Sequence, residues 1–221
     1  MKVLVIAPHP DDEVIGCGGT IAKHILEGDE VYLCVVTKAY PPDWPEDEIK
    51  ERRDEVVRAN KILGIKKTYF LDLPTVKLDT IPQKELNETI AKVVNKLRPE
   101  IVYIPHGGDV NNDHRLVFEA AMVAIRPKPA LAIKKVLCYE TLSETEWAAP
   151  LAENAFMPNV YVDISGVLAT KLKAMSEYKS ELKEFPHPRS LEAISALAKV
   201  RGATTGVEAA EAFMLMREIQ V

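Results

Sequence analysis

The first stretch that could do chemistry is "HPDDE", which follows the apolar run "KVLVIAP" near the start of the chain. It places His9, Asp11 and Asp12 within four positions, and an ionised carboxylate beside a buried strand is costly unless it is paired or binds a metal. His9 and Asp12 are three positions apart around a tight turn, so both can reach one cation, while Asp11 points elsewhere and is free to act as a base. The alternative is a solvated helix start, where the helix dipole favours acids.

A second cluster, "PHGGDVNNDHR", begins at residue 105 and contains His106, Asp109, Asp113 and His114. We expect His114 at a helix start, with Asp113 and Asp109 near enough to orient its second ring nitrogen. His106 is closer to the preceding strand and could be a ligand, a group behind a ligand or a substrate contact. Two histidines and one carboxylate with an open position are the usual ligands of catalytic zinc, and iron(II) or other divalent metals accept the same set. An ordinary loop with Asn112 or Asp113 as N-cap is the alternative.

Length and composition bound the class of protein. The 221 residues are 47% hydrophobic and 28% charged with a formal net charge of −5, and we expect them to form one globular domain over residues 1–221. An acidic chain without a basic stripe argues against a nucleic-acid partner. Three scattered cysteines, and no recognisable leader or long apolar span, favour a cytoplasmic protein without a membrane span.

The elements that must position the two clusters alternate between strand and helix. Apolar runs typical of buried strands alternate with segments of helical spacing through the first half of the chain. This alternation predicts an α/β fold, a Rossmann-like three-layer sandwich with a mostly parallel sheet and helices on both faces. In such sheets ligands bind beyond the carboxyl ends of the strands. We expect these ends to share one edge of the sheet after Pro8, Thr37, Leu71 and Pro105.

The second half of the chain is less regular. "IKKVLCYET" and "NVYVDIS" predict strands, residues 166–185 and 190–202 predict helices, and the tail "AEAFMLMREIQV" fits a helix or an edge strand. Within the loop 140–158, the apolar stretch "ETEWAAPLAENAFMP" is a candidate surface for a homo-oligomer. We expect substrate preference to depend on this loop and on the loops 40–47 and 72–80.

Both clusters resemble motifs of the PIG-L/LmbE-like deacetylase family, zinc-dependent N-deacetylases that act on N-acetylglucosamine-type groups. "PHPDDE" matches the first family motif and "DHR" the second, while "RRDEVVRANKILG" and "PRSLEAISALAKVRG…AEAF" resemble weaker helical signatures of the family. The resemblance implies that His9, Asp12 and His114 bind the metal and that Asp11 is the general base. It also implies a small-molecule partner, an N-acetylated sugar or sugar conjugate.

The chain departs from the family pattern at Asn111, where many members have a histidine. This departure leaves the implied metal ligands intact but removes that histidine's assistance to the oxyanion, which Asp109 or His106 would have to supply. The implied reaction is hydrolysis by water whose pKa the metal lowers to about 7, with Asp11 taking the proton and passing it to the leaving amine.

Two further residues are candidate substrate contacts. Arg52 resembles a family position that contacts sugar hydroxyls, although an arginine in "KERRDE" is commonly only solvated. Trp147, in the 140–158 loop, could stack on a sugar face or simply cover the core.

Two other functions would use similar residues. The first is an amidase that cleaves a sugar-linked cysteine conjugate. The second is a receiver-like signalling domain, which also places paired acids after its first strand and would need Asp72 together with Lys134 or Lys135. Because the receiver scheme has no use for His9 or His114, we expect an enzyme.

Overall fold

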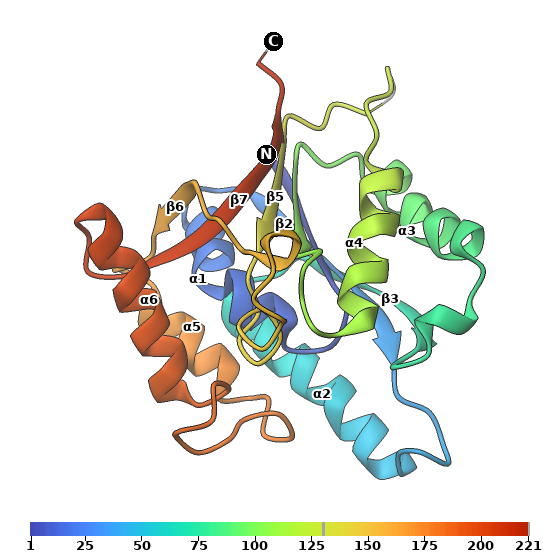
Figure 1. The fold of residues 1–221 in the computed structure, drawn as a ribbon, viewed down its shortest axis with the longest axis horizontal. Helices are drawn as coiled ribbons and strands as arrows, with labels where there is room; N and C mark the ends of the chain where they lie inside the picture. The colour runs from blue at the N-terminus through green and yellow to red at the C-terminus, as the bar shows by residue number, and fades with distance from the viewer. Residues whose placement is uncertain (130, 221) are drawn as a thin grey trace.

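The computed structural model describes residues 1–129 and 131–220, and these residues form one mixed sheet flanked by helices (Figure 1). In this part of the chain the strand order is β3-β2-β1-β4-β5-β7-β6, with β1 to β5 parallel and β7 antiparallel to both neighbours. The strands are β1 (Lys2–Ala7), β2 (Glu30–Lys38), β3 (Lys67–Pro74), β4 (Ile101–Pro105), β5 (Lys135–Tyr139), β6 (Val160–Asp163) and β7 (Ala210–Glu218). The helices are α1 (Asp12–Leu26), α2 (Glu46–Leu63), α3 (Gln83–Leu97), α4 (Asn112–Ala124), α5 (Leu168–Met175) and α6 (Leu191–Thr205), with short 3₁₀ turns at Leu78–Thr80 and Ala152–Asn154.

The central strands bury side chains on both faces, which explains their continuous apolar runs. In β1, Val3 and Val5 pack into a core shared with α1, α2, α5 and α6, whereas Leu4 packs into a core shared with α3 and α4. Figure 1 shows these two groups of helices on opposite sides of the sheet. The predicted three-layer α/β fold is therefore confirmed. Among the described residues, no helix combines the length and the apolar character needed to cross a bilayer.

The carboxyl ends of the parallel strands meet at one edge of the sheet, as predicted. The end of β2 is tied to the segment that leaves β1, because the backbone N–H and the hydroxyl of Thr37 donate to the carbonyl of Pro8 at 3.0 and 2.8 Å. The loop after β5 joins the loop after β4 at the same edge, where the hydroxyl of Thr145 donates to Asp109 at 2.6 Å. Both sequence clusters therefore lie at one mouth.

A close helix–strand contact fixes the start of α1 against the sheet. A Cβ atom at Gly16 would lie 2.2 Å from the ring of Tyr139 at the end of β5, so only glycine allows this approach. The hydroxyl of Tyr139 in turn donates to the carbonyl of Ile6 in β1 at 2.8 Å. The turn between β1 and α1 is thus held by a packed and hydrogen-bonded frame.

The C-terminal half differs from expectation in the length of one helix. The predicted helix over residues 166–185 is helical only over Leu168–Met175. The backbone N–H of Ser180 donates to Glu55 in α2 at 2.9 Å and its hydroxyl donates to the other oxygen of Glu55 at 2.6 Å. These bonds replace the ones that would continue the helix, so residues 176–190 form an irregular segment. Residues 210–218 of the ambiguous tail form strand β7, between β5 and β6, and Val221 lies outside the described residues.

Candidate metal centre and cleft

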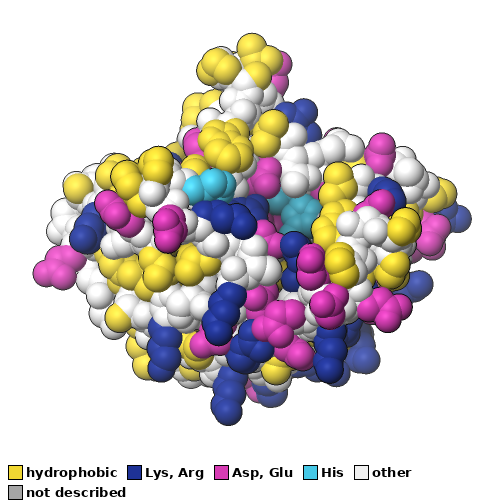
Figure 2. Space-filling view, turned by 90° about the horizontal axis from the view of Figure 1, so that it is seen from below, with side chains coloured by type: hydrophobic (Ala, Val, Ile, Leu, Met, Phe, Trp, Pro, Cys, Tyr) yellow, Lys and Arg dark blue, Asp and Glu magenta, His cyan; other side chains and the backbone are white. Residues whose placement is uncertain are grey.

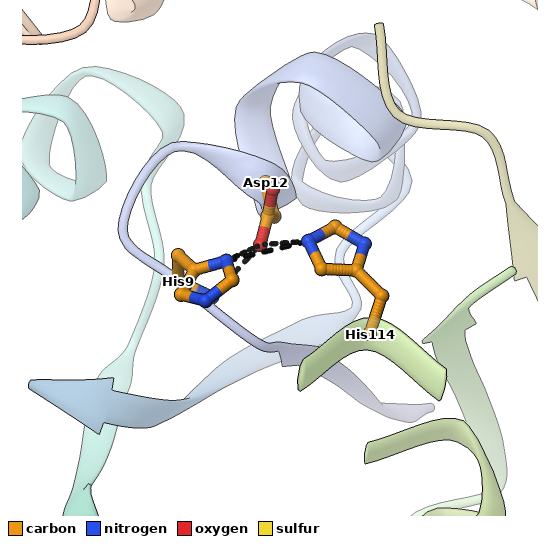
Figure 3. A group of neighbouring side chains, drawn as sticks. All are labelled: His9, Asp12 and His114. Atoms are coloured by element: carbon orange, nitrogen blue, oxygen red, sulfur yellow. Dashed lines mark hydrogen bonds and ion pairs between the residues drawn. The ribbon is translucent and has the colours of Figure 1, made fainter. Parts of the chain in front are cut away.

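Three ligand atoms from the two sequence clusters form a nearly equilateral triangle (Figure 3). His9 Nδ1 lies 3.4 Å from Asp12 Oδ2, and His114 Nε2 lies 3.3 Å both from Asp12 Oδ2 and from His9 Nδ1. Ligands about 2.0–2.2 Å from a tetrahedral zinc ion are separated from one another by roughly 3.3–3.6 Å. The triangle therefore has the sides of one face of a tetrahedral site, with the fourth corner left for another ligand.

Helix starts hold two of the three ligands. Asp12 is the first residue of α1, and its Oδ2 also accepts the backbone N–H of His9 at 2.8 Å, which closes the turn. His114 lies in the first turn of α4, whose N-cap Asn111 accepts the backbone N–H of Asp113 at 3.0 Å. The side chains of Asp12 and His114 are fully buried, so their positions are set by packing as well as by hydrogen bonds.

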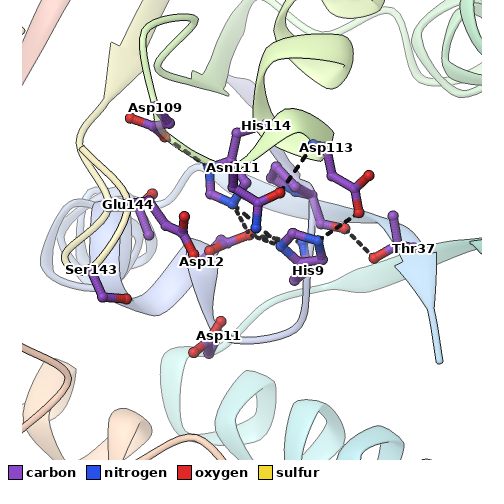
Figure 4. A network of polar contacts seen from close by, with 12 residues as sticks. His9, Asp11, Asp12, Thr37, Asp109, Asn111, Asp113, His114, Ser143 and Glu144 are labelled. Atoms are coloured by element: carbon purple, nitrogen blue, oxygen red, sulfur yellow. Dashed lines mark hydrogen bonds and ion pairs between the residues drawn. The ribbon is translucent and has the colours of Figure 1, made fainter. Parts of the chain in front are cut away.

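The remaining ring nitrogen of each histidine contacts a carboxylate (Figure 4). His114 Nδ1 lies 2.8 Å from Asp109 Oδ2, and His9 Nε2 lies 3.0 Å from Asp113 Oδ2. When these nitrogens carry the N–H groups, the lone pairs of His9 Nδ1 and His114 Nε2 face each other and Asp12. We expected both acids beside His114. The structure instead gives one acid to each histidine, because Asp113 turns toward His9 and also accepts the backbone N–H of Val76 at 2.6 Å.

The electrostatics of the triangle fit a divalent cation. Burial lowers the pKa of His9 and of His114, but the neighbouring carboxylates outweigh it and raise these values to about 9 and about 10. Burial alone would raise the pKa of Asp12, yet the two imidazoles hold it well below its usual range. Asp12 Oδ1 is buried and has no hydrogen-bond partner among the described residues. Two imidazoles and a carboxylate are donors that zinc and iron(II) accept, so these residues form a candidate metal site.

A second group of potential ligands, His24, Glu27 and Asp29, lies where α1 leads into β2, at the opposite edge of the sheet. Both ring nitrogens of His24 are engaged, Nδ1 at 2.7 Å from Asp29 and Nε2 at 3.0 Å from the hydroxyl of Tyr103. Asp29 also accepts the amino terminus of Met1 at 2.5 Å. Asp29 therefore joins the amino group of Met1 to His24 in α1.

Asp11 shares the turn with the triangle, but no hydrogen bond or ion pair joins it to the three ligand atoms within residues 1–129 and 131–220 (Figure 4). Its φ of 95° is in the left-handed region, a conformation that costs a non-glycine residue about 1–3 kcal/mol. Its Oδ2 accepts from Arg189 at 3.2 Å, whereas its Oδ1 is buried without a hydrogen-bond partner in the described part of the chain. Burial raises the pKa of Asp11 well above its usual value. An unpartnered carboxylate oxygen beside a candidate metal site is suited to proton transfer.

His9 of the triangle and Asp11 line a cleft of about 300 Å³, together with residues from the ends of β2 and β3, from α2 and from the irregular segment 176–190. Figure 2 shows the hollow in the face seen from below, with histidine inside it and acidic and basic side chains around it. Trp44 and Phe70 give the lining apolar faces, and Arg52, paired with Glu181 at 2.7 Å, gives it charge. Such a mixture suits a small polar organic ligand. Arg52 is thus in the cleft, as a substrate contact requires.

Two other candidate residues do not line the cleft. The Nε2 of His106 lies 3.0 Å from the carbonyl of Asn154, and its ring lies edge-on to Phe156. Trp147 is 55% exposed and its ring lies edge-on to His187. Asn111, by contrast, does line the cleft.

The geometry of a receiver-like domain is absent from the described residues. Lys134 and Lys135 lie at the amino end of β5, the edge opposite Asp11. They pair with Glu100 and Glu218 at 2.8 and 3.2 Å. Neither lysine can reach the acids that follow β1.

Arg189 is a site residue that the sequence reasoning missed. It lines the cleft and contacts Asp11 across 178 positions of sequence. The only local signal was a charged residue directly before Ser190, the N-cap of α6. Nothing in that pattern specifies the partner of the arginine.

A family model and several known proteins are similar to this chain. The PIG-L model, described as GlcNAc-PI de-N-acetylase, matches residues 4–125, a range that includes both clusters. The chain is 32% identical over 187 residues to the uncharacterized deacetylase YaiS of Escherichia coli, covering 80% of this chain and 90% of that protein. It is 32% identical over 193 residues to the diacetylchitobiose deacetylase of Thermococcus kodakarensis, and the match covers 83% of this chain and 71% of that protein. The solved N,N'-diacetylchitobiose deacetylase from Pyrococcus horikoshii has a TM-score of 0.77 and 27% identity, covering 97% of this chain and 83% of that one.

Proposed function

Because this chain belongs to the PIG-L (GlcNAc-PI de-N-acetylase) family, we propose that it is a metal-dependent hydrolase that removes the acetyl group from an N-acetylglucosamine-type sugar or sugar conjugate. The observation that carries the proposal is the triangle of His9, Asp12 and His114 beside the unpartnered Oδ1 of Asp11. A metal site with an open corner and a base next to it is the arrangement that amide hydrolysis needs.

We assign the metal to His9, Asp12 and His114, with zinc as the proposed ion because its tetrahedral spacing matches the triangle. A divalent metal bound there supplies Lewis acidity toward water and toward the acyl oxygen. Asp109 and Asp113 hold the two imidazoles in the tautomers that direct one lone pair each into the site.

Asp11 is the proposed general base. Its Oδ1 accepts a proton from the attacking water, and the same carboxyl group then donates this proton to the leaving amine. One water and one amide bond thereby become acetate and a free amine. Arg52 is proposed to bind a sugar hydroxyl through its buried Nε–H, which has no hydrogen-bond partner among the described residues, while Glu181 holds the other end of the guanidinium.

The substrate class is tested with protein that has been stripped by a chelator and reloaded with zinc. It is incubated with N-acetylglucosamine, diacetylchitobiose and a thiol–sugar conjugate, and both acetate and primary amine are measured. We expect equal amounts of acetate and amine from at least one N-acetyl sugar, and neither product before reloading. Cleavage of the thiol conjugate without acetate from the sugars would indicate an amidase. No cleavage of any of these compounds by the loaded protein would contradict the proposal.

The role of Asp11 is tested with Asp11→Asn. We expect unchanged metal content and a kcat lower by roughly 10²–10⁴-fold, the usual contribution of a general base. Asp47→Asn is the matched control, because Asp47 is exposed on α2 and does not line the cleft. Wild-type turnover by Asp11→Asn would show that another group removes the proton.

A further inference from the structure

We propose that Arg189 is a positioning residue that fixes the carboxylate of Asp11 so that only Oδ1 is available for proton transfer. The inference rests on the proposed function of Asp11. It concerns a residue that comes from the far end of the chain and reaches the site through the irregular segment between α5 and α6.

The guanidinium of Arg189 is held by four acceptors at the site. Its Nε donates to the hydroxyl of Ser143 at 2.8 Å, and its Nη2 donates to Glu144 at 3.3 Å. Its Nη1 donates to Glu181 at 3.1 Å and to Asp11 Oδ2 at 3.2 Å. Four of the five N–H donors of an arginine are thereby used within the protein. This leaves little of the guanidinium for a substrate and favours a positioning role.

The backbone around Arg189 is also fixed. Its N–H donates to the Nδ1 of His187 at 3.0 Å, and its carbonyl accepts the N–H of Lys183 at 3.3 Å. The next residue, Ser190, caps α6 by accepting the N–H of Ala193 at 3.1 Å. The backbone that carries the guanidinium is therefore held in place, and the side chain of Arg189 is only 15% exposed.

The two oxygens of Asp11 have different surroundings. Oδ2 is bound by Arg189, which makes the one ion pair to Asp11 found in the described residues, whereas Oδ1 is buried without a partner. The backbone at Asp11 is in the left-handed region, but this does not fix rotation about the side-chain bonds. Arg189 supplies that constraint, and a planar guanidinium sets direction as well as charge, which an ammonium group does not.

The test compares Arg189→Ala and Arg189→Lys with Arg58→Ala. Arg58 is the matched control because its guanidinium, like that of Arg189, pairs with an acid of segment 176–190, Glu177 at 3.0 Å, but it does not line the cleft. For Arg189→Ala we expect kcat to fall by roughly 10²-fold, the usual cost of misplacing a reacting group by about 1 Å, with KM and metal content close to wild type. Guanidinium ion at low millimolar concentration should restore part of the lost kcat in Arg189→Ala and none in Asp11→Asn.

Two kinetic outcomes would overturn the proposal. A raised KM with unchanged kcat would make Arg189 a substrate-binding residue. In the second outcome, Arg189→Ala loses its metal or does not fold, whereas Arg189→Lys folds, keeps its metal and has the full wild-type kcat. Arg189 would then be a structural residue. If Arg189→Ala does not fold, the test rests on Arg189→Lys. The proposal requires that this variant, which lacks the planar guanidinium, has a reduced kcat at unchanged KM.

A crystal structure of Arg189→Ala separates this proposal from the proposed function. We expect the Asp11 carboxylate to rotate while His9, Asp12 and His114 keep their positions. An unchanged Asp11 would overturn the positioning role, even if the wild-type protein is an active deacetylase. Wild-type protein that hydrolyses no N-acetyl sugar would overturn the function of the site, and the structure of the variant would still report on what holds Asp11.

Discussion

Asp109→Asn tests how the carboxylates that contact the two histidines of the triangle contribute to metal binding. Asp109 and His114 are both fully buried, and their contact of 2.8 Å fixes the tautomer of the proposed metal ligand. Asparagine keeps the shape and one acceptor oxygen, so the ring keeps its orientation but loses the negative charge behind it. Removal of such an outer partner typically weakens metal binding by 10- to 100-fold, which corresponds to about 1.4–2.7 kcal/mol.

The assay is a competition for zinc between the protein and a chelating dye at fixed pH. Thr145→Val is the control, because its hydroxyl contacts the other oxygen of Asp109 at 2.6 Å and carries no charge. We expect Thr145→Val to bind zinc within about threefold of wild type, well short of the effect of removing the charge. Zinc affinity of Asp109→Asn within twofold of wild type would refute the reasoning, since the buried carboxylate would then contribute nothing through His114.

Two further predictions concern the frame around the site. Glu211→Gln should lower the free energy of unfolding by about 3–5 kcal/mol in urea titrations, because the buried ammonium of Lys171, which lies 2.5 Å from Glu211 in the wild type, loses its counter-charge. The control is Lys134→Ala, which breaks an exposed pair and should lower the free energy of unfolding by at most about 1 kcal/mol. Equal losses in the two variants would contradict this account. Burial would raise the pKa of Asp29, but hydrogen bonds from the amino terminus and His24 lower it in the folded protein. The ionised Asp29 therefore stabilises the fold at pH values above its unfolded-state pKa, and this stabilisation is lost as the pH falls through the lower folded-state pKa. The stability difference between wild type and Asp29→Asn should therefore shrink below about pH 4, and a difference that grows on acidification would show the sign to be wrong.

The parts of the fold that depend on local pattern could be predicted from the sequence. The apolar run of β1 and the helical spacing of α4 predicted their elements, and the parallel order then brought the residues that follow β1 and β4 to the same edge. His9, Asp12 and His114 were expected together for this reason, and the structure brings them together. Each of these inferences needs only short-range periodicity and one rule of sheet topology.

The contacts between distant irregular segments could not be predicted in this way. The helical pattern of residues 166–185 was interrupted because Ser180 bonds to Glu55 on another helix, which no periodicity within the segment reveals. The same interruption brings Arg189 to Asp11. The partner of Asp113 was also misplaced, because two side chains at one helix start can turn in different directions, and here the backbone N–H of Val76 draws Asp113 toward His9.

The most direct test of the account is the metal content of purified protein after dialysis, measured by elemental analysis for the wild type, His9→Ala, His114→Ala and His106→Ala. The three ligand atoms of the triangle predict one divalent metal per wild-type chain and a near-complete loss in His9→Ala and His114→Ala. His106→Ala should keep the metal, because that ring contacts the carbonyl of Asn154. Full metal retention in His114→Ala, or its loss in His106→Ala alone, would contradict the assignment of the site.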